Sequence, residues 1–267
     1  MTGRVAVVTG AARGIGAATV LALAAGGWSI LAVDSAADDP ALPYPMASPA
    51  DLSGVVSRAN ESAGVLGRVR SFVADVRDPD AVTAAVAEAE QRWGGLDAAI
   101  AVAGVVAGGV PLWEVPLAQQ QAVLDVDLGG VLSLARAAVP ALLRRPAPRS
   151  GRFLAVASAA ATRGLPMLAA YCAAKAGVAG LIRALAAELA DSGVTANAVS
   201  PGSTATPILD QSARLYELPG AEAFAGQQPV RRLLDPAEVA AVLVFLASPA
   251  SSGMTGAVVP VDGGLAL

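Results

Sequence analysis

The stretch Val5-Ala-Val-Val-Thr-Gly-Ala-Ala-Arg-Gly-Ile-Gly16 joins an apolar run to a glycine-rich turn. The run is typical of a buried strand, and the residues from Gly14 to Ala25 follow a helical pattern. In such a turn Gly10 permits the tight bend, Gly14 lets the backbone approach a pyrophosphate, and Gly16 lets the helix pack close to the sheet. Unpaired N–H groups at the start of that helix favour an anion. The stretch therefore predicts a dinucleotide site; an ordinary glycine turn is the alternative.

The rest of the chain continues this alternation of strand-like runs and Ala/Leu-rich helical patterns. Alternation of this kind predicts βαβ units and a parallel sheet with helices on both faces. Without a Pro/Gly/Ser linker between two cores, we expect one α/β domain over residues 1–267, a doubly wound, seven-stranded Rossmann fold. The expected strands are Val5–Val8, Ser29–Val33, Val69–Ala74, Ala98–Val102, Gly151–Ala157, Thr195–Val199 and Ala257–Val261; the expected helices include Gly14–Ala25, Pro79–Trp93, Leu117–Arg145, Ala170–Ala190 and Pro236–Ala247.

Composition narrows the class of protein. The 267 residues are 55% hydrophobic and carry a net charge of −4, with no basic patch of the kind that nucleic-acid binding requires. The uncharged stretch Ala98–Trp113 is short for a membrane span and is broken by glycine and proline. We therefore expect a soluble, cytoplasmic protein with neither nucleic-acid nor membrane partners. The chain has no histidine and one cysteine, so histidine-based triads are excluded and no metal site is expected.

Asp34 ends the second expected strand, 18 residues after Gly16. A carboxylate at this place accepts hydrogen bonds from the ribose hydroxyls and repels a 2′-phosphate, which favours NAD over NADP. The alternative is that Asp34 only begins the following loop.

Two segments interrupt the alternation of strands and helices. The insert, residues 35–67, contains the four prolines Pro40, Pro43, Pro45 and Pro49, and its second half, Ser48–Ala63, has the spacing of a short helix. The substrate loop, residues 207–229, combines a long loop with a helical piece. Long excursions of this kind are often lids or binding loops, and a surface excursion without function is the alternative.

Tyr171 and Lys175 are four residues apart in a helical pattern, so both project from one face. A nearby ammonium lowers the pKa of a tyrosine, which supplies acid/base chemistry in a chain without histidine. Ser158 ends the strand just upstream, at the edge of the sheet where ligands bind. The alternative role for Ser158 alone is to cap backbone.

From Arg4 to Leu265 the chain resembles the short-chain dehydrogenase/reductase (SDR) family. The resemblance rests on the turn Thr9–Gly16, Asp75-Val76, Ser158, Tyr171 with Lys175, Asn197-Ala-Val-Ser-Pro-Gly202 with Thr206, and Asp262-Gly-Gly264. It implies hydride transfer between NAD and an alcohol or carbonyl, with Tyr171 exchanging the proton, Ser158 binding the substrate oxygen and Lys175 binding the nicotinamide ribose. The implied cofactor-binding residues are Gly10, Arg13, Gly14, Ile15, Gly16, Asp34, Asp75, Val76, Ala103, Gly104, Tyr171, Lys175, Pro201, Gly202, Thr204 and Thr206.

The sequence departs from the family pattern at two places. The usual Asn-Asn-Ala-Gly is Ala101-Val-Ala-Gly104, and the asparagine of the catalytic tetrad is replaced by Asp127. In the family that asparagine holds a water in a proton relay from the lysine. Asp127 can accept from the same water and favours the ammonium form of Lys175. The alternative for Asp127 is a local hydrogen bond in its own helix.

Together with the insert, these departures resemble the mycofactocin-coupled branch of the family. Matching stretches include Ala101–Trp113, Gly151–Ala160, Tyr171–Lys175 and Val199–Thr204. The resemblance implies a tightly held, non-exchangeable NAD that the redox carrier mycofactocin reoxidises in place. Tyr44 of the insert would stack on the adenine or, alternatively, pack against the protein.

Two other functions stay open at this point. One is a conventional NAD(H)-exchanging reductase acting on ketones or 3-oxoacyl thioesters, and the other is a non-catalytic NAD-binding scaffold. The family also implies a homotetramer built through Leu117–Arg145 and Ala170–Ala190. For the substrate we expect a small hydrophobic secondary alcohol or ketone between apolar walls, supplied by Val105, Val106, Trp113, Leu165, Met167, Leu168, Leu209, Leu215, Tyr216 and Phe224.

Overall fold

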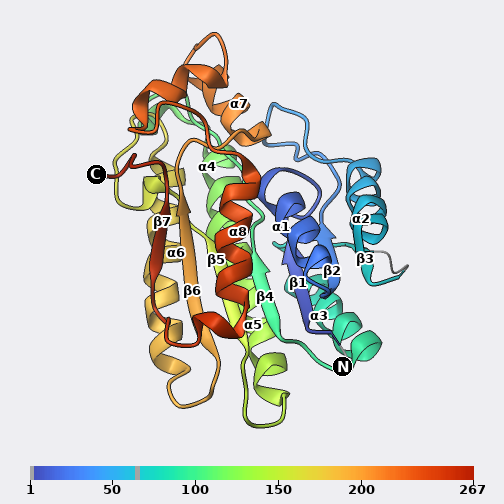
Figure 1. Ribbon diagram of the computed structural model, residues 1–267. Helices are drawn as coiled ribbons and strands as arrows, with labels where there is room; N and C mark the ends of the chain where they lie inside the picture. The colour runs from blue at the N-terminus through green and yellow to red at the C-terminus, as the bar shows by residue number, and fades with distance from the viewer. Residues whose placement is uncertain (1–2, 64–66) are drawn as a thin grey trace.

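The first strand along the chain lies inside the central sheet, and the order of the following strands reverses direction there. The computed structural model describes residues 3–63 and 67–267, in which seven parallel strands pair in the order β3-β2-β1-β4-β5-β6-β7 (Figure 1). From β1 the chain first moves outward to β2 and β3, and then returns to β4 on the other side, so the crevice between β1 and β4 is the place where such sheets bind ligands. The strands are β1 (Val5–Thr9), β2 (Ser29–Asp34), β3 (Val69–Val73), β4 (Ala98–Ala101), β5 (Arg152–Val156), β6 (Thr195–Pro201) and β7 (Val258–Val261).

Helices cover both faces of this sheet, as the continuous apolar strands require. Along β1, Val5 and Val7 belong to one buried core and Ala6 and Val8 to the other, because successive side chains point to opposite faces. The first core contains residues of α3 (Pro79–Trp93), α5 (Gly130–Arg144) and α6 (Ala169–Glu188); the second contains residues of α1 (Gly14–Ala25), α2 (Pro49–Ala63) and α8 (Pro236–Ala247). The predicted doubly wound α/β fold is confirmed.

The long helix that we expected at Leu117–Arg145 is not regular throughout. It consists of α4 (Leu117–Leu124), a π-helical turn (Asp125–Gly129) and α5. Turns of this kind are rare and often occur at functional sites, and this one contains Asp127. A residue-periodicity pattern does not distinguish one wide turn from its α-helical neighbours, so the sequence did not predict it.

Two helices are long and apolar enough to span a membrane by length and composition alone, Leu117–Arg144 and Ala169–Glu188. Both supply residues to the buried core on one face of the sheet, among them Leu134 and Ile182. A core helix of an α/β protein can have the same length and apolar composition, so these two criteria alone do not indicate a membrane span.

The two excursions fold beside the carboxyl ends of the strands. The insert contains a flap, residues 35–48, and helix α2, which begins one residue later than the expected Ser48–Ala63 and ends where expected; residues 64–66 lie outside the described residues. The substrate loop contains α7 (Pro207–Leu215) and a 3-10 segment (Ala221–Gln227). In Figure 1 the flap and α7 both rise above the same edge of the sheet.

Candidate active site

A cavity of about 860 Å³ opens at the carboxyl ends of the strands, between the flap and α7. All sixteen predicted cofactor-binding residues line it, from Gly10 to Thr206, and so does Ser158. Asp127 is the exception among the predicted site residues, because it is fully buried beside the cavity and does not line it.

The glycine-rich turn forms one end of this cavity. Gly14 has a φ of +50°, and a Cβ on it would lie 3.1 Å from Cγ2 of Thr206, so the turn and the β6–α7 loop approach closely. A Cβ on Gly16 would overlap the carbonyl oxygen of Gly10, so only glycine fits there. Helix α1 begins with neither a side-chain cap nor an acidic residue in its first turn. Its N–H groups and helix dipole therefore face the cavity and suit the pyrophosphate of a dinucleotide.

Asp34 lies at the end of β2, on the wall of the same cavity. One carboxylate oxygen accepts from the backbone N–H of Ala12 at 3.0 Å, and the other accepts from that of Ala36 at 3.1 Å. These bonds attach Asp34 to the glycine-rich turn and also start the flap, as the alternative interpretation proposed. Each oxygen keeps a further lone pair, so the carboxylate still suits two ribose hydroxyls. The turn and Asp34 together fit an NAD molecule.

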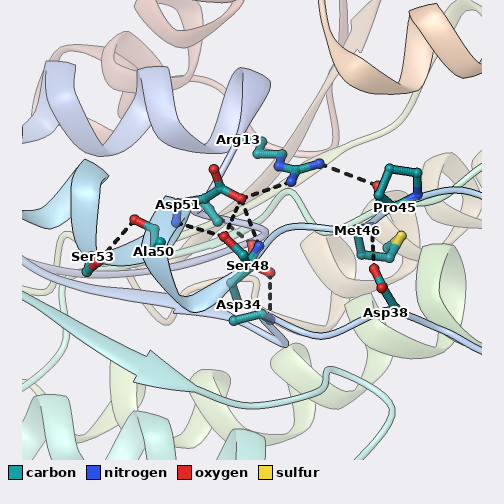
Figure 2. Close-up of polar contacts among 11 residues, drawn as sticks. Arg13, Asp34, Asp38, Pro45, Met46, Ser48, Ala50, Asp51 and Ser53 are labelled. Carbon is teal, nitrogen blue, oxygen red and sulfur yellow. Dashed lines mark hydrogen bonds and ion pairs between the residues drawn. The ribbon is translucent and has the colours of Figure 1, made fainter.

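Arg13 of the glycine-rich turn holds the flap and the start of α2. Its guanidinium lies 2.9 Å from a carboxylate oxygen of Asp51 and donates to the carbonyl of Pro45 at 3.4 Å (Figure 2). The same oxygen of Asp51 accepts from the backbone N–H and the hydroxyl of Ser48, both at 2.8 Å. These donors lower the pKa of Asp51 to about 2. Arg13 thus lines the predicted cofactor site, but its charge is already paired with the flap.

Two further contacts fasten the flap across the cavity. The hydroxyl of Tyr44 accepts from the backbone N–H of Val106 at 3.0 Å, beyond β4. Burial raises the pKa of this tyrosine to about 12, so it stays protonated. Arg77 binds Asp39 of the flap at 2.6 Å and Asp75 at 2.6 Å. Sequence reasoning missed Asp39 and Arg77, because nothing in the local pattern places the β3–α3 turn beside the flap.

Ser158, Tyr171 and Lys175 come together at the other end of the cavity, as predicted. Lys175 is buried in α6, donates to the carbonyl of Val156 at 3.2 Å, and lies with its Nζ 5.5 Å from the centre of the Tyr171 ring. The hydroxyl of Ser158 accepts from the backbone N–H of Ala160 at 3.1 Å and so caps a short 3-10 turn. Ser158 therefore has the capping role that we considered and still faces the cavity.

Asp127 forms a buried ion pair with Lys175, with Nζ 3.2 Å from Oδ2. Its Oδ1 accepts from the backbone N–H of Val105 at 2.7 Å, just after β4. The alternative of a local bond within its own helix is therefore wrong, since both partners lie on other elements. A Cβ on Gly104 would lie 3.4 Å from Nζ of Lys175, which shows how closely the β4 loop covers this pair.

The ion pair changes the acid/base balance of the tyrosine. Burial raises the pKa of Tyr171; Lys175 and Ser158 lower it, and the charge of Asp127 raises it again. The net direction is upward. We expected Lys175 to bring the pKa down, and this expectation holds for the contribution of Lys175 but is wrong for the sum, since burial and Asp127 outweigh it. The pKa of Lys175 is also raised, with Asp127 opposing the effect of burial.

Apolar side chains close the cavity beside Tyr171. Of the ten predicted wall residues, six line it: Val105, Leu165, Leu168, Leu209, Tyr216 and Phe224. The other four do not, namely Val106, Trp113, Met167 and Leu215. Val106 is buried instead, while Trp113 is 84% exposed on the short 3-10 turn Leu112–Glu114. The sequence did not reveal which of these side chains reach the cavity.

The loop that would hold the nicotinamide is supported from behind by Gln228. This side chain is fully buried, accepts from the backbone N–H of Ser203 at 2.9 Å, and donates to the carbonyl of Arg232 at 2.7 Å. A Cβ on Gly202 would lie 2.7 Å from the carbonyl oxygen of Asp262, so this loop also needs glycine. Sequence reasoning missed Gln228, which has no motif around it.

The cavity joins a dinucleotide-binding turn to a Ser-Tyr-Lys group, which defines the class of nicotinamide-dependent oxidoreductases. Comparison with known proteins agrees. The family model described as enoyl-(acyl carrier protein) reductase matches residues 10–266. The chain belongs to the short-chain dehydrogenase/reductase family and is an NAD-dependent oxidoreductase of that family.

Similar proteins cover the chain nearly from end to end. The cis-4-hydroxycyclohexanecarboxylate dehydrogenase of Sinomonas cyclohexanicum is 39% identical over 98% of this chain and 96% of its own. The 3-oxoacyl-[acyl-carrier-protein] reductase FabG of Thermotoga maritima is 33% identical over 100% and 99%. A crystal structure of carveol dehydrogenase from Mycobacterium avium in complex with NAD has a TM-score of 0.91 and 34% identity, and covers 99% of this chain and 98% of its own.

Proposed function

We propose that this enzyme interconverts a hydrophobic secondary alcohol and its ketone. The observation that supports this proposal is a single cavity with the glycine-rich turn and Asp34 at one end and Ser158, Tyr171 and Lys175 at the other. Similar proteins include dehydrogenases named for a hydroxycyclohexanecarboxylate and for carveol.

In the proposed mechanism Tyr171 gives its proton to the carbonyl oxygen during reduction and takes a proton from the hydroxyl during oxidation. Ser158 donates a hydrogen bond to that oxygen and orients the substrate. Lys175, held by the carbonyl of Val156 and by Asp127, offsets part of the negative charge that develops on the phenol oxygen. Bound NAD would supply the redox chemistry, and the turn at Gly10–Gly16 with Asp34 would hold it.

We further propose that NAD stays bound during turnover and that mycofactocin reoxidises it in place. The flap supports this, because three contacts fasten it beside the cavity: Arg13 with the carbonyl of Pro45, Tyr44 with Val106, and Arg77 with Asp39. A flap held at three points would have to loosen at each before the cofactor leaves, which slows dissociation.

Native mass spectrometry of the desalted protein, with no cofactor added, tests retention. About one NAD per chain supports the mycofactocin-coupled function, and a dye acceptor with an alcohol panel follows. An apo chain that binds NADH on titration and reduces ketones indicates the conventional exchanging reductase instead. An apo chain that binds NADH without turnover indicates a scaffold.

We also propose a cytoplasmic homotetramer assembled through the long helices. Leu117 is 76% exposed and Leu132 is 48% exposed along the helix Leu117–Arg144, and a partner subunit would cover such side chains. Light scattering that reports a monomer at micromolar concentration would contradict this assembly.

A further inference from the structure

Two arginines reach the substrate end of the cavity, the part between the β5–α6 loop and α7. Arg163 comes from that loop and Arg214 from α7, and both line the cavity. Among residues 3–63 and 67–267, no carboxylate lies within ion-pair distance of either guanidinium. Asp210 also lines this end and, like both arginines, is exposed; it pairs with neither of them, and two arginines outnumber one carboxylate. Lys175 is already neutralised by Asp127. The substrate end therefore has an excess of positive charge.

Gln211 adds a polar group without a protein partner. Its side chain is only 7% exposed and lines the cavity, and in the described part of the chain its amide makes no hydrogen bond. Within the described residues the amide is not among the polar groups that are buried without a partner, so it is open to water or to a ligand in the cavity. Gln211 and Arg214 are three residues apart on α7 and share one face of the helix. This face presents an amide and a guanidinium to the same space.

Arg163 is held across from that face. One of its terminal nitrogens donates to the carbonyl of Leu265 at 2.6 Å, which leaves its other N–H groups for a ligand. The sulfur of Cys172, the neighbour of Tyr171, lies 3.9 Å from the carbonyl of Arg163. The hydroxyl of Tyr216 donates to the carbonyl of Pro166 at 2.6 Å and joins the end of α7 to this loop. The loop of Arg163 and helix α7, which carries Arg214, therefore meet at the same end of one cavity.

We infer that the substrate carries a carboxylate in addition to its alcohol or carbonyl group. Arginine donors and an amide suit a carboxylate, and the apolar walls at Leu165, Leu168 and Phe224 suit a hydrocarbon body. This inference rests on the proposed function and narrows its substrate class to hydrophobic hydroxy acids and oxo acids.

The test compares 4-oxocyclohexanecarboxylate and 4-acetylbenzoate with their methyl esters, on protein loaded with NADH. Calorimetry measures binding and NADH absorbance measures turnover. We expect the wild type to bind each acid at least tenfold more tightly than its ester. Arg163→Met and Arg214→Met should each reduce acid binding and kcat/KM at least tenfold and leave the esters within twofold, because charge-assisted hydrogen bonds are lost. Gln211→Leu should act in the same direction with a smaller effect.

The control is Arg92→Met, which changes a partly exposed arginine on α3 that does not line the cavity. It should behave as the wild type. Equal affinity for acids and esters, no binding of either acid, or arginine variants that weaken acids and esters alike would overturn the inference. Selective binding of the acids without NADH oxidation would keep the inference and reject the proposed function, so the two failures are distinguishable.

Discussion

The ammonium of Lys175 lies 3.2 Å from the carboxylate of Asp127, and both side chains are buried. The family pattern has a neutral asparagine at the position of Asp127. The negative charge raises the pKa of both Tyr171 and Lys175. Burial is the larger cause for Tyr171, and the ion pair adds to it. If Tyr171 exchanges the proton as proposed, Asp127 should move the pH range of that exchange upward.

Replacing this carboxylate with an amide should move the pH profile. In Asp127→Asn the charge that raises the pKa of Tyr171 is gone, so the phenolate forms at lower pH. The acidic limb of kcat/KM for alcohol oxidation should shift to lower pH. The alkaline limb for ketone reduction, which needs the protonated phenol, should shift the same way. Asp125→Asn in the same π-helical turn is the control, and its profile should not move. A profile of Asp127→Asn identical to the wild type would show that the pair does not control the tyrosine.

Removing the phenolic hydroxyl should separate chemistry from cofactor binding. Tyr171→Phe should lower kcat by about 10²- to 10⁴-fold, the usual contribution of a positioned acid/base group. The dissociation constant for NADH should stay within about threefold of the wild type, since Lys175 and the glycine-rich turn are untouched. Steady-state kinetics and NADH fluorescence titration measure the two quantities. Turnover near the wild-type rate would refute the assigned role of Tyr171.

Loosening the flap should speed the release of NAD. Tyr44→Phe removes the hydrogen bond to Val106, worth about 0.5–1.5 kcal/mol, so release should be about 2- to 10-fold faster. Arg13→Met should have a smaller effect, because its ion pair with Asp51 is more than one third exposed. A chase with excess labelled NAD measures the rate. Arg92→Met, which breaks a surface pair on α3, is the control. Rates equal to the wild type in both flap variants would mean that the flap does not retain the cofactor.

Cofactor choice should depend on the charge of Asp34. Asp34→Asn keeps an oxygen that can accept from Ala12 or Ala36 but no longer repels a 2′-phosphate. The ratio of kcat/KM for NAD to that for NADP should fall at least tenfold. Parallel assays with both cofactors measure this ratio. If this ratio does not change, the role of Asp34 is limited to its hydrogen bonds with the backbone of Ala12 and Ala36.

Local patterns predicted most of the fold. Each strand lies within two residues of its expected ends. For the central strands this follows because a buried parallel strand needs only a short apolar run, whereas the edge strand β3 is mostly exposed. The helix Pro79–Trp93 was predicted to the residue, since Asp78 caps its start and Gly94 adopts the left-handed conformation at its end. The π-helical turn at Asp127 escaped prediction because it depends on packing against α6 and the β4 loop rather than on residue spacing.

Local patterns alone predicted the doubly wound fold, the dinucleotide turn and the Ser158, Tyr171 and Lys175 group, because each of these is encoded in short segments. How that group is charged and how the cavity is closed depend on the tertiary structure. The contacts that fasten the flap join residues 32 to 62 positions apart, and no local pattern records such a pairing. The pairing of Asp127 with Lys175 likewise depends on how the π-helical turn and α6 pack together. Burial of Tyr171, with a further contribution from Asp127, raises the pKa that Lys175 alone would lower.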